Sequence, residues 1–250
     1  MTTPDAPIES RPRDADAWAR PVDRLATTAT TTGLDTVTGR RVAGPVQGFG
    51  QMWQKTFSVR LDGLTMSPEE LVARWKEEFP AFWPKGARFY APLSGIQPGE
   101  VALLEVPPVP GSPVRMSTGV MVIYADRESF TFMTPEGHAL SAWITFSAYR
   151  DGDVTIAQTQ ALERTADPFI EISYVFGANR ANDRFWEQTM KNLATAMGVA
   201  DPVVEARAVC VDRRRQWHYV RNLRFSPALS MAVGTVTAPS RWLRRRRATR

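Results

Sequence analysis

The chain has 250 residues, of which 43% are hydrophobic and 23% are charged. These proportions match ordinary globular proteins and exclude collagen-like, disulfide-stapled and wholly disordered chains. One cysteine and two histidines cannot supply a Cys/His zinc site, and a single thiol cannot form an internal disulfide. We therefore expect a protein of a reducing compartment, the cytoplasm, with no metal site and no cofactor.

Charge is distributed unevenly along the chain. The formal net charge of +5 divides into 0 for residues 1–50, −4 for residues 51–200 and +9 for residues 201–250. The basic character therefore belongs to the C-terminal segment. The high pI does not mark the whole protein as a nucleic-acid binder.

Residues 1–47 form the first of three predicted segments. They are rich in proline and threonine and show no sustained apolar period. Few large hydrophobic side chains are available to offset the entropy of ordering, so we expect a flexible leader. Acidic residues also interrupt the apolar run that a secretion signal needs, and no such signal is predicted.

Residues 48–198 carry the pattern of a folded domain. Polar and apolar residues alternate after Gly48, which indicates a strand. Ser67 and Pro68 then mark the start of a helix that ends near Phe79. Antiparallel strands are predicted next, at residues 88–92, 100–106, 118–125, 129–134, 139–149 and 154–163. A long helix follows from Asn182 to Met197.

This order of elements resembles the helix-grip fold of the SRPBCC superfamily, also called START-like. The resemblance covers residues 48–198 and rests on the element order, on residues 137–146 (GHALSAWITF), on Asp167-Pro168-Phe169 and on Phe185-Trp186. It implies an α+β protein whose curved antiparallel sheet wraps around the long helix. It also implies a cavity between sheet and helix for a hydrophobic or amphipathic small molecule or a lipid. Typical members end at this helix, whereas this chain continues for 52 residues beyond Gly198.

Polar and aromatic residues that could face such a cavity are the candidate ligand contacts: Lys55, Trp83, Tyr90, His138, Gln158, Gln160, Glu171 and Tyr174. Lys55 shares a strand face with apolar residues, and a buried lysine needs a carboxylate partner, for which Glu171 is a candidate. Gln158 and Gln160 either orient a ligand or reach water through a twist or bulge of their strand. Each of these residues also has an ordinary interpretation as a core, turn or surface residue.

Motifs that name a reaction are missing from the sequence. It contains no phosphate-binding loop, no nucleophile elbow and no metal-binding helix. Our main hypothesis is therefore binding or carriage of a hydrophobic small molecule or lipid, and no residue is assigned as catalytic. The alternative is a cofactor-independent enzyme of cyclase or hydrolase type, with His138 or Glu171 handling a proton in the same cavity.

Residues 199–250 form a basic extension, in which a second helical stretch is predicted from Asp201. The extension ends in a polybasic run that contains a tryptophan: Arg241, Trp242, Arg244, Arg245, Arg246 and Arg247. Such a run is typical of contact with an anionic membrane. It also fits nucleic acid, another anionic partner or a solvated tail. The apolar stretch before it has only 15 residues, too few to cross a bilayer.

Overall fold

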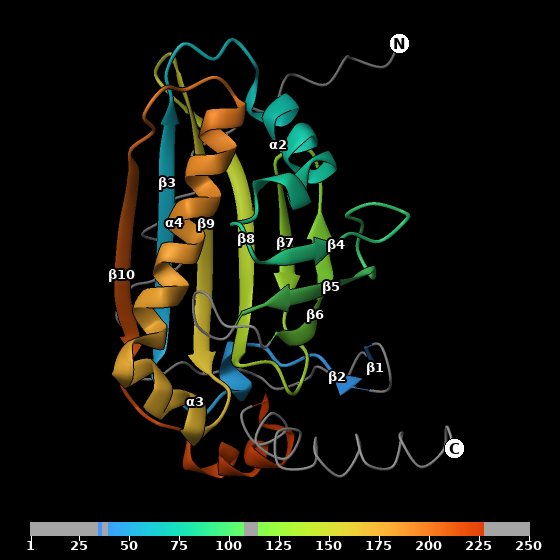
Figure 1. Cartoon of the computed structure of the whole chain (residues 1–250), viewed down its shortest axis with the longest axis vertical. Helices are drawn as coiled ribbons and strands as arrows, with labels where there is room; N and C mark the ends of the chain where they lie inside the picture. Colours follow the sequence, from blue (N-terminus) through green and yellow to red (C-terminus); the bar gives the residue numbers. More distant parts are fainter. Residues whose placement is uncertain (1–34, 37–39, 108–114, 228–250) are drawn as a thin grey trace, which may run out of the picture.

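The computed structural model describes residues 35–36, 40–107 and 115–227. Its main feature is one antiparallel sheet of eight strands in the order β10-β3-β9-β8-β7-β6-β5-β4 (Figure 1). These strands are Met52–Leu61 (β3), Arg88–Tyr90 (β4), Val101–Val106 (β5), Met116–Ala125 (β6), Ser129–Met133 (β7), Leu140–Asp151 (β8), Val154–Thr165 (β9) and Val204–Asp212 (β10). Two short strands, Asp35–Thr36 (β1) and Arg40–Arg41 (β2), pair with each other.

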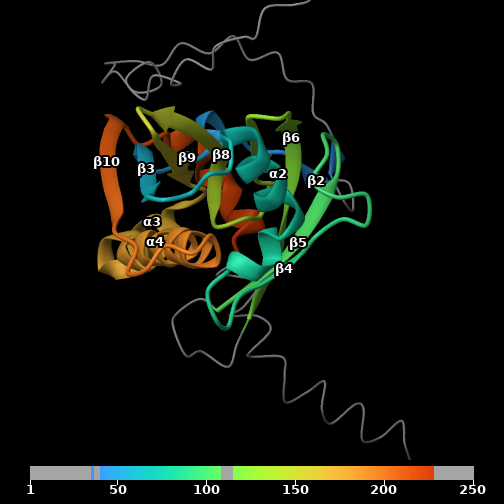
Figure 2. The same cartoon turned by 90° about the horizontal axis from the view of Figure 1, so that it is seen from above.

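The two longest helices lie on one face of the sheet. The sheet curves around α2 (Pro68–Glu77) and α4 (Asn179–Ala196), as the view from above shows (Figure 2). The remaining helical segments are α3 (Pro168–Ser173), the π-helical turn η4 (Tyr174–Ala178), and the 3₁₀ helices η2 (Pro45–Gln47), η3 (Phe79–Phe82) and η5 (Trp217–Phe225). The predicted α+β helix-grip arrangement is therefore confirmed. No helix among the described residues is long and apolar enough to cross a membrane.

Helix α2 begins where its sequence predicts. The Ser67 side chain accepts a hydrogen bond from the Glu70 N–H at 3.2 Å, and the Glu70 side chain accepts one from the Ser67 N–H at 2.8 Å. This capping box satisfies two N–H groups that the helix leaves unpaired. The apolar side of the helix, with Leu71 and Trp75, is fully buried against the sheet.

Aromatic side chains fill the space between the sheet, α2 and the adjoining part of α4. Phe146 of β8 stacks on Phe130 of β7 with ring centroids 4.8 Å apart, and it lies 5.0 Å from Phe79 and 5.4 Å from Trp75. All four side chains are fully buried, and Trp186 of α4 covers them at 5.8 Å from Phe146. We call these five residues the aromatic core.

The segment after α4 differs from the sequence prediction. Residues from Asp201 were expected to be helical, but Val204–Asp212 forms β10, which pairs with β3. The valines of this segment fit a helical spacing, yet Val209 and Val211 alternate in the strand and pack beside β3 and β9. Pairing also covers the edge of β3, whose N–H and C=O groups would otherwise lack partners. Only the following residues, in η5, are helical.

Arg164 of β9 fastens the end of β10. It is 1% exposed, forms an ion pair with Asp212, and donates a hydrogen bond to the carbonyl of Arg214 at 2.8 Å. The ion pair and the hydrogen bond hold the chain that follows β10 against the end of β9. This return places η5 beside the start of β8.

The end of the predicted leader is also part of the folded structure. Val42, Ala43 and Pro45 are buried, and the Ala43 N–H donates to the carbonyl of Thr134 at 2.7 Å. These small apolar residues cover the end of the sheet. No periodic pattern in the sequence of this segment indicates that contact. Outside the described residues lie most of residues 1–39 and the candidates Arg241, Trp242, Arg244, Arg245, Arg246 and Arg247.

Candidate functional site

Lys55 of β3 is the centre of a buried polar cluster between the sheet and α4. Its Nζ lies 2.9 Å from Glu163 of β9 and 2.6 Å from Asp183 of α4, and it donates to the Asn179 side chain at 2.5 Å. Lys55 is 1% exposed and Glu163 is 3% exposed. Burial opposes the charged ammonium, but the two carboxylates outweigh it and raise the pKa of Lys55 above 10.5.

Tyr174 of η4 completes this cluster. The Lys55 Nζ lies 5.7 Å from the centroid of its ring. Burial, together with the charges of Glu163 and Asp183, raises the pKa of Tyr174 well above 10.0, so the phenol stays protonated. Every charge in the cluster has a partner from another element of the fold. The cluster therefore acts as an anchor that fixes the start of α4 against β3 and β9.

Glu171 is not the partner of Lys55, and the predicted pairing is wrong. Its carboxylate lies 2.8 Å from Nε of Arg215 and accepts a hydrogen bond from Thr165 at 2.7 Å. Gly50 packs against it so closely that a Cβ there would lie 2.3 Å from a Glu171 oxygen. Glu171 thus links α3 to the chain before η5.

Gln158 and Gln160 lie on the face of the sheet opposite to α4. Thr159 between them faces the helix, because its hydroxyl contacts the Met190 sulfur at 3.1 Å. Side chains alternate along a strand, so both glutamines point the other way. Both are buried, and their Nε2 atoms have no acceptor among the described residues. They do not line a space between sheet and helix.

Trp83 and Tyr90 are also separate from each other. Trp83 packs at the edge of the aromatic core, with its ring centroid 5.2 Å from Phe89 and 5.1 Å from Phe185 of α4. Tyr90 points outward, is 44% exposed, and donates to Glu105 at 3.2 Å. Tyr90 is therefore a surface residue in this fold.

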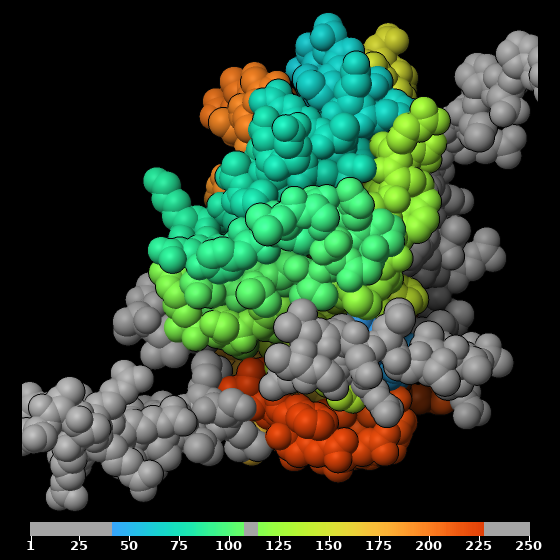
Figure 3. Space-filling model, turned by 90° about the vertical axis from the view of Figure 1, so that its right-hand side faces the viewer, coloured from blue at the N-terminus to red at the C-terminus, as the bar shows by residue number. Residues whose placement is uncertain are grey.

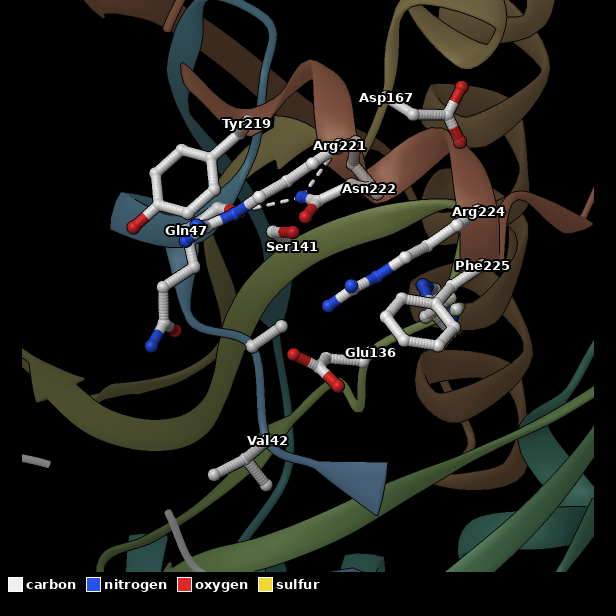
Figure 4. Close-up of a pocket in the computed structure, with 14 residues that line it drawn as sticks. Val42, Gln47, Glu136, Ser141, Asp167, Tyr219, Arg221, Asn222, Arg224 and Phe225 are labelled. Atoms are coloured by element: carbon white, nitrogen blue, oxygen red, sulfur yellow. Dashed lines mark hydrogen bonds between the residues drawn. The ribbon is translucent and has the colours of Figure 1, made fainter. Parts of the chain in front are cut away.

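A pocket of about 310 Å³ lies at the end of the sheet where β8 begins and β9 ends (Figure 4). Its lining comes from Val42, Ala43 and Gln47, from the turn between β7 and β8, from Ser141 of β8, from the junction of β9 and α3, and from η5. Asn222 of η5 holds these segments together, since its side chain donates to the carbonyls of Gln47 and Ala166, each at 3.0 Å. We call this site the end pocket.

Two arginines of η5 supply positive charge to the end pocket. Arg221 lies over the Tyr219 ring at 5.6 Å, and Arg224 lies over the Phe225 ring at 4.5 Å. In Figure 4 the Arg224 guanidinium extends into the space between Ser141 and the β7–β8 turn. Neither guanidinium forms an ion pair with any residue that the structure describes.

Asp167 lines the end pocket from the side of α3. Its Oδ1 accepts hydrogen bonds from the N–H groups of Phe169 at 2.8 Å and Ile170 at 3.1 Å, which caps α3. Its carboxylate points toward α3 and away from Arg221 and Arg224 (Figure 4). Asp167 is thus engaged with α3, and Glu136 of the β7–β8 turn is the other acidic residue that lines the end pocket.

His138 is the one sequence candidate that lies in the end pocket. Its Nδ1 lies 3.0 Å from the nitrogen and 3.1 Å from the oxygen of Leu140, so the backbone fixes the ring. Burial lowers the pKa of His138 to about 4. The imidazole is therefore neutral at neutral pH and suits hydrogen bonding better than general-base catalysis, which favours a pKa near the working pH.

This low pKa makes a prediction about stability. The unfolded chain protonates His138 below pH 6.5, but the folded chain does so only below about pH 4, so protonation between these values favours unfolding. Between pH 7.5 and pH 5, the free energy of unfolding of the wild type should fall by about 2 kcal/mol more than that of His138→Gln. Urea unfolding followed by tryptophan fluorescence measures this difference. Parallel pH curves for the two proteins would contradict the assignment.

The sequence singled out His138 but missed the other groups of the end pocket. Arg221 and Tyr219 were noted only as part of a basic, aromatic segment, and nothing local connects them with Ser141 or Gln47. Among the described residues, no three His, Cys, Asp or Glu side chains are placed to hold a metal ion.

No protein-family model matches the chain, and no curated protein matches its sequence. Solved structures match it in shape. Protein Ms6760 from Mycobacterium smegmatis is 9% identical with a TM-score of 0.41, over 58% of this chain and 90% of its own. TTHA0849 from Thermus thermophilus is 13% identical with a TM-score of 0.44, over 59% and 99%. DynU16, from the dynemicin biosynthetic locus, is 12% identical with a TM-score of 0.37, over 58% and 48%. These likenesses carry no argument about function.

Proposed function

We propose that the chain is a ligand-binding protein of the SRPBCC, or START-like, type that holds a small amphipathic acid in the end pocket. The observation that carries this proposal is the pair Arg221 and Arg224, whose guanidinium groups flank the pocket without an acidic partner among the described residues. A guanidinium presents a planar fork of donors that matches a carboxylate or phosphate. The ring contacts with Tyr219 and Phe225 hold both forks in place before a ligand arrives.

The rest of the end pocket supports an amphipathic ligand. Val42, Ala43 and Phe225 offer apolar contacts, while Ser141 and the neutral His138 offer hydrogen bonds. A volume of about 310 Å³ lies at the lower limit of small-molecule sites, which suits a body of roughly one ring. The aromatic core favours this location over the space beside α2, because its side chains already contact one another there.

Binding is favoured over catalysis by the two groups considered for proton transfer. His138 has a pKa far below neutrality, and Glu171 is paired with Arg215 outside the end pocket. His138 is a weak base at neutral pH, and Glu171 does not line the end pocket, so neither is placed to take a proton from a bound molecule. Binding is therefore the function that these two residues favour.

The test compares acids with their uncharged amides. Benzoate and benzamide form the first pair, and 3-phenylpropionate and its amide the second, with binding measured by calorimetry. We expect each acid to bind at least about tenfold more tightly than its amide, because only the acid can form an ion pair with an arginine of the end pocket. The double variant Arg221→Gln/Arg224→Gln should remove this preference and leave the weak binding of the amides unchanged.

The matched control is Arg180→Gln/Arg184→Gln, which removes two exposed arginines of α4 that do not line the end pocket. This control should bind the acids as the wild type does. Equal binding of acid and amide to the wild type, or an acid preference that survives in Arg221→Gln/Arg224→Gln, contradicts the proposed site.

A further inference from the structure

Four large apolar side chains of α3 and η4 face solvent. Phe169 is 48% exposed, Ile172 53%, Val175 72% and Phe176 84%. Phe169, Ile172 and Val175 recur at every third residue, which places them on one side of the helical segment. Phe176 follows at a kink, where its backbone and that of Gly177 leave helical geometry. The opposite side packs on the protein through Ile170, which is 8% exposed. The packing of the fold accounts for the burial of Ile170. It does not account for the four exposed side chains, which together form an apolar surface patch.

Helix η5 extends this apolar surface. It packs beside α3, and the pair Arg215–Glu171 joins the two segments, which meet at the lower end of the molecule (Figure 1). Trp217 of η5 is 70% exposed, although its ring is fixed edge-on against Phe49 at 5.2 Å. Figure 3 shows η5 as a continuous surface at this end, below the strands. We call Phe169, Ile172, Val175, Phe176 and Trp217 the docking face.

Arginines without acidic partners flank the docking face. Arg180 and Arg184 follow it on α4, and Arg213 and Arg214 precede η5; all four are exposed, and none forms an ion pair with a described residue. The nearby acids are already paired: Glu171 with Arg215, Asp183 with Lys55, and Asp212 with Arg164. The rim of the docking face is therefore positively charged.

We propose that the docking face binds the surface of an anionic lipid bilayer. Exposed phenylalanine and aliphatic side chains enter the boundary between headgroups and acyl chains, tryptophan favours that boundary, and arginines contact lipid phosphates. A second copy of the chain fits less well, because two such faces would bring their arginine rims together. This proposal does not depend on the ligand of the end pocket, nor on the basic residues beyond residue 227.

The test is co-sedimentation of the full chain with lipid vesicles. We expect binding to phosphatidylcholine vesicles that contain about 30 mol% phosphatidylglycerol, weak binding to pure phosphatidylcholine, and weakening in about 0.5 M salt. The variant Phe169→Ser/Phe176→Ser should lower the partition coefficient at least about tenfold, because it removes two inserted side chains. The matched control Leu93→Ser/Leu103→Ser removes two exposed leucines away from this face and should bind within about twofold of the wild type.

Two results would overturn the proposal. One is equal binding of the wild type to vesicles with and without phosphatidylglycerol, including no binding to either. The other is unchanged binding of Phe169→Ser/Phe176→Ser, which would assign membrane contact to other basic residues of the chain. Circular dichroism spectra of both variants are compared with that of the wild type first, to check that each variant retains the fold.

Discussion

Lys55→Met is expected to lower the free energy of unfolding by about 3–5 kcal/mol, the usual cost of breaking a buried ion pair by removing one partner. The methionine keeps most of the volume of the side chain but leaves Glu163, which is 3% exposed, without its cation. The Asp183 side chain is 29% exposed, so water can solvate its carboxylate when Lys55 is removed. Most of the lost stability therefore comes from the unpaired charge of Glu163. Urea unfolding at neutral pH measures the effect.

A matched control separates the loss of the buried charge from the loss of any lysine. Lys85→Met, at an exposed lysine, should change the free energy of unfolding by no more than about 0.5 kcal/mol.

A double variant tests the same cluster in a second way. Lys55→Met/Glu163→Gln removes both buried charges and should be more stable than Lys55→Met alone. If Lys55→Met costs less than about 1 kcal/mol, the cluster is not the anchor of α4 that its distances indicate.

Phe146→Ala is expected to cost about 3–5 kcal/mol, because it opens a cavity at the centre of the aromatic core. Phe146 is fully buried and contacts Phe130, Phe79 and Trp75 with ring centroids 4.8–5.4 Å apart. Removing its ring takes contacts from three other elements at once. Thermal and urea unfolding both report the loss.

The matched control for this prediction is Phe176→Ala, at a ring that is 84% exposed, which should change stability by no more than about 0.5 kcal/mol. A cost below about 1 kcal/mol for Phe146→Ala would mean that the interior is loosely filled. That result would favour a ligand cavity beside α2 and weaken the choice of the end pocket.

Much of the sheet is predictable because local patterns determine it. Strands β4 to β9 all lie within two residues of their predicted bounds, since alternation and short turns mark each of them. Helix α2 was equally readable from Ser67 and Pro68. These signals lie within about ten residues of the element that they define.

Features that depend on distant pairing were not predictable. Strand β10 forms because the edge of β3 is available, about 150 residues earlier in the chain, and its own residues also fit a helical period. The end pocket depends in the same way on Asn222, which ties η5 to Gln47 and Ala166. No spacing in a single sequence indicates that these segments meet.

For Lys55, the sequence predicts the kind of partner but not its identity. A buried lysine needs a carboxylate, and the structure places two beside it, Glu163 and Asp183. The partner was misassigned because it depends on register: β3 aligns Trp53 with Glu163 and Lys55 with Ala161, which places the Glu163 side chain diagonally beside Lys55. Glu171 instead follows a turn that carries it toward Arg215.

The most direct test of the proposed ligand site is a map of amide chemical-shift changes during titration with benzoate. If the end pocket binds the acid, the largest changes will fall on Gln47, His138, Ser141 and residues 219–225, and Arg221→Gln/Arg224→Gln will abolish them. Changes centred on Phe146, Trp186 and Met190 would place the ligand between the sheet and α4. That result would contradict the end pocket as the binding site.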